Sequence, residues 1–174
     1  MALLNFKKSK DQPAPIKDFN GLLSGFSMEI MPRTAEKVES FSNILPKDTL
    51  IYIAHIDGTS IDDMVRTAVR LGNEGFKVMP HFPARIIKDK PTLSDWIDRY
   101  VSEAGVKQAL LLAGGIDTPK GSFDSSMQLL ETELFDKYGF TDLNVAGHPE
   151  GNNDIDQDNT CLLYTSDAAD DASS

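Results

Sequence analysis

The sequence has little cysteine, few basic residues and no long apolar run, and each shortage excludes a class of protein. Its one cysteine, Cys161, cannot form a disulfide within the chain. No apolar run reaches the ~18 residues of a membrane span, and the apolar start is too short for a secretory signal. Seventeen basic against 27 acidic residues give a formal net charge of −10, which does not attract nucleic-acid phosphates. We therefore expect a cytoplasmic protein that binds neither nucleic acid nor membrane.

What is present divides the chain of 174 residues into three parts. Residues 1–24 are polar and predict a flexible N-terminal arm. Residues 25–160 alternate apolar and amphipathic segments. Residues 161–174, CLLYTSDAADDASS, closely resemble a translated sequencing adapter, so we expect them to be disordered and Cys161 to carry no chemistry. On this interpretation the natural gene continues beyond Thr160, and residues 25–160 are the N-terminal part of a truncated domain.

The middle part alternates predicted strands with predicted helices. The strands are short apolar runs at 26–31, 49–56, 76–82, 106–115 and 143–148, and the helices are amphipathic segments at 34–45, 60–75, 92–105 and 125–139. This order predicts an α/β fold with a parallel sheet covered by helices. A flavodoxin-like open sheet would be complete at this length, whereas a (β/α)8 barrel usually needs about 250 residues. We favour a partial (β/α)8 TIM barrel with about five β-α units.

Polar residues stand where the apolar runs end. All three histidines do so: His55 in IYIAHIDG, His81 in KVMPHFPA and His148 in NVAGHPEG. Because the carboxyl ends of parallel strands share one edge of a sheet, we expect these side chains to converge on one crevice. Any single histidine has an equally simple interpretation, a hydrogen bond that fixes a loop.

Two further features predict chemistry. Glu29 lies between Met28 and Ile30, so we expect a poorly solvated carboxyl. Desolvation raises the pKa of a carboxyl group, as a general acid requires, although a glutamate satisfied by a neighbouring strand would look the same. The segment AGGIDTPKGS contains Gly114 and Gly115, whose backbone N–H groups are suited to hold a phosphate or a flavin. An ordinary turn is an equal interpretation of that segment.

Four short motifs resemble those of the methylenetetrahydrofolate reductases, which are flavoenzymes on a (β/α)8 barrel. They are FSMEIMPRT around Glu29, the Pro-His pair that ends with His81, LLLAGGIDTP with Asp117, and VAGHPEG with His148 and Glu150. The motifs occur in the family's order, and the resemblance covers about residues 25 to 153. The arginine of the family's fourth-strand turn is absent, and Ala113 and Gly114 occupy that region.

The resemblance implies FAD as cofactor, NAD(P)H as electron donor and reduction of 5,10-methylenetetrahydrofolate to 5-methyltetrahydrofolate. Glu29 would protonate a folate nitrogen, and Asp117 would tune the charge of the flavin and pterin rings. The residues expected at the cofactor are Thr59, His81, Gly114, Gly115, Asp117, His148 and Glu150. No metal is expected, the full-length parent is expected to be a homo-oligomer, and the chain alone is expected to be inactive.

Two alternatives come from other classes of protein. A metal-dependent hydrolase on a barrel would use His55, His81 and His148 with a carboxylate as ligands. Such barrels often carry a His-x-His pair on one strand, which this sequence lacks. The other alternative is a non-catalytic α/β binding module.

Overall fold

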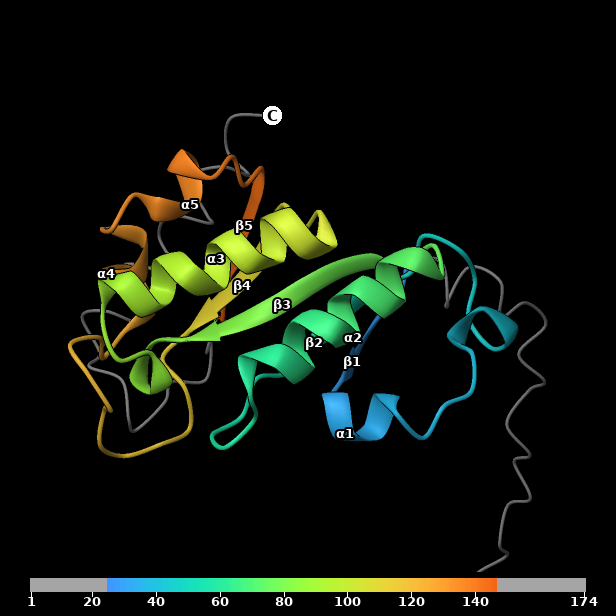
Figure 1. Cartoon of the computed structure of the whole chain (residues 1–174), viewed down its shortest axis with the longest axis horizontal. Coiled ribbons are helices and arrows are strands. Elements are labelled where there is room, and N and C mark those ends of the chain that lie inside the picture. The colour runs from blue at the N-terminus through green and yellow to red at the C-terminus, as the bar shows by residue number, and fades with distance from the viewer. Residues whose placement is uncertain (1–24, 147–174) are drawn as a thin grey trace, which may run out of the picture.

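A computed structural model describes residues 25–146, whose strands form one parallel sheet (Figure 1). Its strands are β1 (Ser27–Ile30), β2 (Leu50–Ile53), β3 (Lys77–Pro83), β4 (Gln108–Leu112) and β5 (Asp142–Val145). The strands follow one another across the sheet in the order β1-β2-β3-β4-β5, and every neighbouring pair is parallel. The predicted α/β fold with a five-stranded parallel sheet is confirmed. A flavodoxin-like sheet has the order 2-1-3-4-5, so that alternative is wrong.

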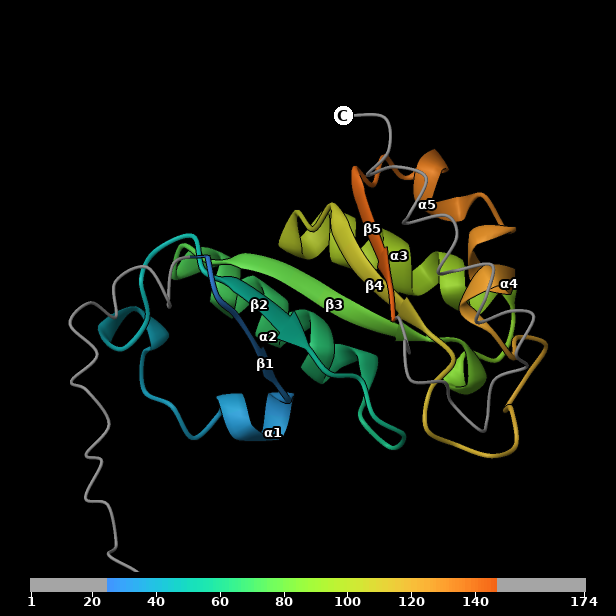
Figure 2. The same ribbon diagram turned by 180° about the vertical axis from the view of Figure 1, so that it is seen from behind.

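The two long helices cover one face of this sheet. In Figure 1, α2 (Ile61–Asn73) and α3 (Lys90–Ala104) lie in front of the strands, and in Figure 2 they lie behind them. This placement is expected, because right-handed crossovers between successive neighbouring strands put each helix on the same side. We call this side the covered face and the opposite side the open face.

Local signals place both long helices where the sequence predicts them. The Ser60 hydroxyl accepts a hydrogen bond from the Asp63 N–H (3.1 Å) and caps α2. The Asp89 carboxylate caps α3 by accepting from the Thr92 N–H (2.9 Å). Helix α3 ends at Gly105, whose φ of 64° is the left-handed conformation that favours glycine.

The core lies between the covered face and these helices. Phe82 of β3 is fully buried, and its ring makes edge contacts with Phe135 (5.2 Å between centroids) and Phe140 (6.5 Å). The residues that fill the core are apolar; the largest include Phe41, Ile51, Ile53, Met64, Leu71, Leu93, Ile97 and Tyr100. No helix within residues 25–146 is long and apolar enough to span a bilayer.

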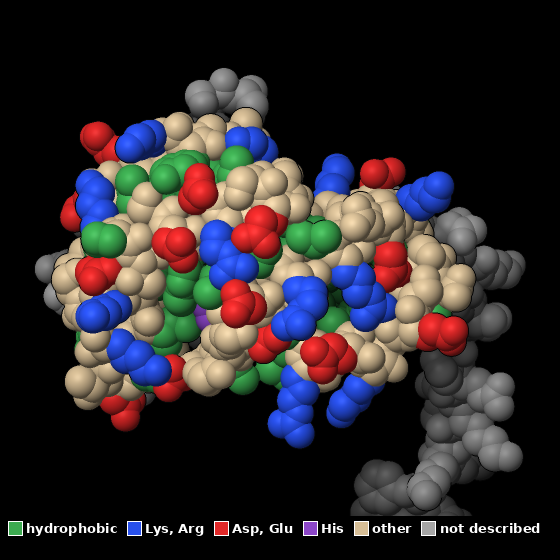
Figure 3. Space-filling view, viewed as in Figure 1, with side chains coloured by type: hydrophobic (Ala, Val, Ile, Leu, Met, Phe, Trp, Pro, Cys, Tyr) green, Lys and Arg blue, Asp and Glu red, His purple; other side chains and the backbone are tan. Residues whose placement is uncertain are grey.

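The outer surface of the helices mixes charges of both signs. Arg66 pairs with Asp63, and Arg99 pairs with Asp62 (2.6 Å) and Glu103 (2.8 Å). Figure 3 shows basic and acidic side chains interspersed over this side. The described part of this side therefore presents no broad basic patch of the kind that binds nucleic acid.

Two predicted helices are wrong in extent. Residues 34–45 form only α1 (Pro32–Ala35) and a 3-10 turn (Phe41–Asn43). Residues 125–139 form α4 (Ser126–Leu130) and α5 (Leu134–Lys137), separated by a break at Glu133, whose φ is 59°.

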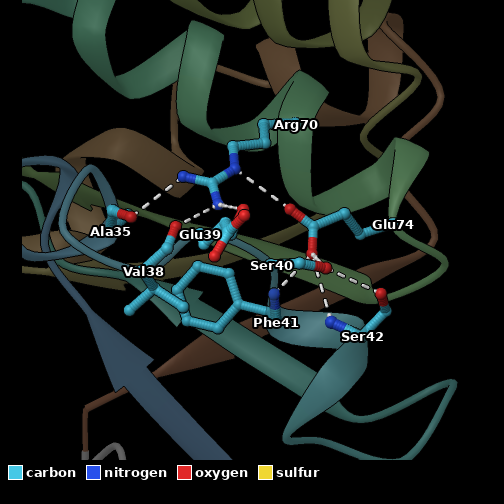
Figure 4. A network of polar contacts seen from close by, with 8 residues as sticks. All are labelled: Ala35, Val38, Glu39, Ser40, Phe41, Ser42, Arg70 and Glu74. Atoms are coloured by element: carbon cyan, nitrogen blue, oxygen red, sulfur yellow. Dashed lines mark hydrogen bonds and ion pairs between the residues drawn. The ribbon is translucent and has the colours of Figure 1, made fainter.

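In the segment after α1, several backbone groups bond to the side chains of Arg70 and Glu74, at the C-terminal end of α2, instead of to one another (Figure 4). Arg70 donates to the carbonyls of Ala35 (2.9 Å), Val38 and Glu39 (3.1 Å). Glu74 accepts from the N–H groups of Phe41 (2.6 Å) and Ser42 (3.2 Å). Burial alone would raise the pKa of Glu74, but these backbone hydrogen bonds, with those from Arg70 and Ser40, lower it. We call this arrangement the Arg70–Glu74 clasp.

Candidate active site on the open face of the sheet

Alternation along the strands brings polar side chains from β1, β2 and β3 to the open face. Glu29 is in register with Tyr52, and Tyr52 with Met79. His81 lies two residues beyond Met79, on the same side of β3 because successive side chains alternate. Glu29, Tyr52 and His81 therefore share the open face.

Glu29 and His81 approach each other directly. Their Oε2 and Nε2 atoms are 3.4 Å apart, which is within ion-pair range. The contact is not aligned as a hydrogen bond, and Nε2 is buried without a hydrogen-bond partner. Burial lowers the pKa of His81 from its usual 6.5, and the Glu29 charge opposes the shift. Burial of the ring therefore favours its neutral form.

The expectation that Glu29 has a poorly solvated carboxyl is wrong for the described residues. Its side chain is 61% exposed, whereas that of His81 is 10% exposed. Met28 and Ile30, its apolar neighbours in sequence, pack towards the core, and alternation turns Glu29 away from them. Apolar sequence neighbours in a strand therefore do not bury the residue between them.

Sequence reasoning missed two polar residues of this face. The Tyr52 ring lies edge-on to His81, with 6.1 Å between centroids. Asn144 of β5 places its amide nitrogen 3.2 Å from the Met79 sulfur. Period-two alternation within TLIYIAHI, counted from its buried isoleucines, was the signal that could have placed Tyr52 here.

His55 does not join this group. Its ring stacks on Trp96 of α3, with centroids 4.7 Å apart, and its Nε2 donates to the Thr59 carbonyl (3.1 Å). Burial lowers the pKa of His55 to about 4, so the ring is neutral at pH 7. For this histidine the structural interpretation, a hydrogen bond that fixes a loop, is confirmed. Thr59 lies in that same loop and is partly buried.

The glycine turn after β4 has one glycine that the backbone requires and one that it does not. Gly114 has a φ of 99°, and a Cβ there would lie 3.1 Å from the Pro83 Cβ. Gly115 faces open space. Asp117 is exposed, and within residues 25–146 it has no hydrogen bond or ion pair with Glu29 or His81.

The rest of this loop is tied to the segment after β3. The Arg85 N–H donates to the Ala113 carbonyl (2.9 Å), and the Lys120 N–H donates to the Arg85 carbonyl (2.7 Å). The Arg85 guanidinium pairs with Asp124 (2.8 Å) and reaches the Ile116 carbonyl (3.3 Å). The backbones are so close that a Cβ on Gly121 would lie 1.7 Å from the Lys88 oxygen.

The loops after β2 and β4 also contact each other through an ion pair between Asp57 and Lys120. The hydrogen bond that Lys120 donates, together with its charge, lowers the pKa of Asp57. The loops around Thr59 and around Gly114 and Gly115 are thus joined beside the carboxyl ends of the strands. His148 and Glu150 lie outside the described residues.

Two hollows, of about 520 and 270 Å³, lie at the opposite edge of the sheet. Both include Lys77 and Gln108, the first residues of β3 and β4. Active sites of parallel α/β folds lie instead at the carboxyl ends of the strands. We therefore place the candidate site at Glu29 and His81.

Within residues 25–146 no three His, Cys, Asp or Glu side chains are grouped as metal ligands. His55 and His81 lie in different environments, because His55 packs on Trp96 whereas His81 faces Glu29. No protein-family model matches the chain.

Proposed function

We propose that the chain is the N-terminal part of a flavin-dependent reductase that converts 5,10-methylenetetrahydrofolate to 5-methyltetrahydrofolate with NAD(P)H. The observation that carries the proposal is the approach of Glu29 and His81, from β1 and β3, to 3.4 Å on one face. The resemblance of four motifs to the reductase family implies that an acid, Glu29, lies close to a histidine at the cofactor, His81.

The sheet supports the barrel that the proposal requires. Sequential parallel strands with both long helices on one face are the arrangement of a (β/α)8 barrel. Closing such a sheet would turn the open face inwards and enclose Glu29 and His81. We propose that the β-α units needed for closure follow Thr160 in the parent protein.

The residues present fit a flavin at the joined loops. Gly115 leaves open space beside its backbone, and the loop of Thr59 is held next to it by the ion pair between Asp57 and Lys120. Thr59, Gly114, Gly115 and Asp117 would hold FAD, with the His81 ring beside it and with His148 and Glu150 outside the described part. When bound, FAD would carry the hydride from NAD(P)H to the one-carbon unit of the substrate.

Glu29 would supply the proton. In the described structure it is exposed to water, and a ligand lying on the open face would remove that water. Loss of water around a carboxyl favours its protonated form, which is the form that donates to a folate nitrogen. The ligand, rather than the fold alone, would thus turn Glu29 into an acid.

The test uses the parent protein that this proposal requires, with its further β-α units after Thr160. We expect it to retain flavin on purification and to oxidise NAD(P)H only when methylenetetrahydrofolate is present. The chain of 174 residues alone should show no such turnover. Bound zinc without flavin in the parent would contradict the proposal and favour a metal-dependent hydrolase.

The substitution Glu29→Gln separates a reductase from a binding module. Loss of turnover with retained flavin would support the catalytic role of Glu29, since removing a general acid typically costs about 10²–10⁴-fold in rate. Unchanged turnover would contradict it. Glu36→Gln, at another exposed glutamate, is the matched control.

A further inference from the structure

We propose that His81 is a positioning residue that passes a proton from solvent to Glu29. This inference rests on the proposed function, because it takes Glu29 as the acid. The resemblance places His81 only at the cofactor. Its position in the structure points instead to a second task, in which it keeps the acid supplied with protons while a ligand covers the open face.

The two sides of the imidazole face different surroundings. Nε2 is the buried ring nitrogen, and it lies 3.4 Å from the Glu29 carboxylate. The remaining tenth of the side chain is exposed, so the ring keeps contact with solvent. A ligand on the open face would separate Glu29 from water and leave the His81 ring beside it, at 3.4 Å.

The proton transfer balances without a further reactant. A proton from water or buffer acid adds to Nδ1 of the Nε2–H tautomer and gives an imidazolium. When the ligand presses the two side chains into an aligned hydrogen bond, the Nε2–H bond breaks as the Oε2–H bond of Glu29 forms, which leaves a neutral ring protonated at Nδ1 and a neutral carboxylic acid. No electrons are transferred, and the ring resets when product leaves and water returns.

The groups around His81 leave Glu29 as its main charge partner. Burial lowers the pKa of His81, and among the described residues Glu29 is the group whose charge raises it. Tyr52 of β2 contacts the ring edge, and His55 is close enough to be affected by the charge of His81. On β4 the neighbour in register is Leu110, and beyond it on β5 is Asn144, both uncharged.

The test is an NMR titration of the imidazole C–H resonances in the chain of 174 residues. Resonances are assigned with His55→Gln and His81→Gln variants. We expect Glu29→Gln to lower the titration midpoint of His81, because the charge that opposes its burial is lost. The midpoint of His55 should move less than that of His81, since it responds only through the charge of His81, and a midpoint that stays lowered by burial shows that the variant is folded.

Glu36→Gln controls for a general loss of negative charge. A His81 midpoint that is unmoved by Glu29→Gln, or moved equally by Glu36→Gln, would overturn the proposed pair.

A second measurement tests the relay in the parent enzyme. His81→Gln should lower turnover at least ~10-fold and change its pH profile, and added imidazole should restore part of the rate to a His81→Ala variant. If the parent has reductase activity but His81→Gln does not change its pH profile, the proposed relay is wrong and the proposed function is still supported. If the parent has no reductase activity, the proposed function is wrong, and the relay falls with it even where the NMR coupling between the two side chains is present.

Discussion

The two faces of the sheet use buried histidine in opposite ways. On the covered side His55 packs on Trp96 and donates to the Thr59 carbonyl, so its ring is held by the fold. On the open face His81 is almost as buried, yet it faces an exposed carboxylate. Burial lowers the pKa of both rings, so a shifted pKa alone does not mark a site. What distinguishes His81 is a titratable partner on an accessible surface.

From this comparison we expect substitutions at the Arg70–Glu74 clasp, at Gly121 in the loop after β4 and at His55 to change the stability of the fold. Substitutions of Glu29 and His81 on the open face should change the reaction instead. The single tryptophan, Trp96, lies against His55 and reports unfolding by fluorescence.

The largest loss should follow Arg70→Ala. This change removes hydrogen bonds to three carbonyls and the partner of Glu74, and leaves the Glu74 carboxylate partly buried. We expect unfolding to become easier by about 3 kcal/mol in urea titrations. Arg66→Ala, at an exposed ion pair of the same helix, should cost about 0.5 kcal/mol or less. Equal losses for the two variants would show that the Arg70–Glu74 clasp is not what holds the segment after α1.

A smaller loss should follow Gly121→Ala. The new Cβ would overlap the Lys88 backbone, so the loop after β4 must shift, at about 2 kcal/mol. Gly115→Ala adds a Cβ in open space and should change the unfolding free energy by about 0.5 kcal/mol or less. A neutral Gly121→Ala would mean that this loop is not anchored on the segment after β3.

The smallest effect is a pH dependence from His55. Burial lowers its pKa from the ordinary histidine value of 6.5 to about 4 in the fold, so between those values the unfolded chain binds the extra proton. Stability therefore falls as pH falls through this window, by about 1–2 kcal/mol between pH 7 and pH 5. His55→Gln should flatten that part of the curve of unfolding free energy against pH. An equally steep curve in the variant would assign the dependence to other groups.

The sequence predicted best what local signals determine. Helices α2 and α3 have caps at Ser60 and Asp89 and apolar stripes of helical period, and each of the five strands overlaps one of the short, mainly apolar runs. The prediction of a helix over residues 34–45 was wrong because the hydrogen-bond partners of that segment, Arg70 and Glu74, lie at the C-terminal end of α2. No pattern within residues 34–45 reports those distant partners.

The site was predicted in part for the same reason. The strand-end pattern predicted that His81 would face Glu29, and the two groups lie 3.4 Å apart. The solvation of Glu29, in contrast, depends on which face of β1 its side chain takes. That choice is set by packing of Met28 and Ile30 against the core. Tyr52 was missed because a tyrosine in an apolar run looks like core until its register with Glu29 is known.

The central claim is that Glu29 and His81 meet on the open face of the sheet, and a nuclear Overhauser measurement on the chain tests it most directly. We predict a cross-peak between the Glu29 side-chain protons and the His81 ring, and a separate one between His55 and Trp96. A Glu29 that shows cross-peaks to Trp96 instead, or none to His81, would place the two groups apart and contradict the account.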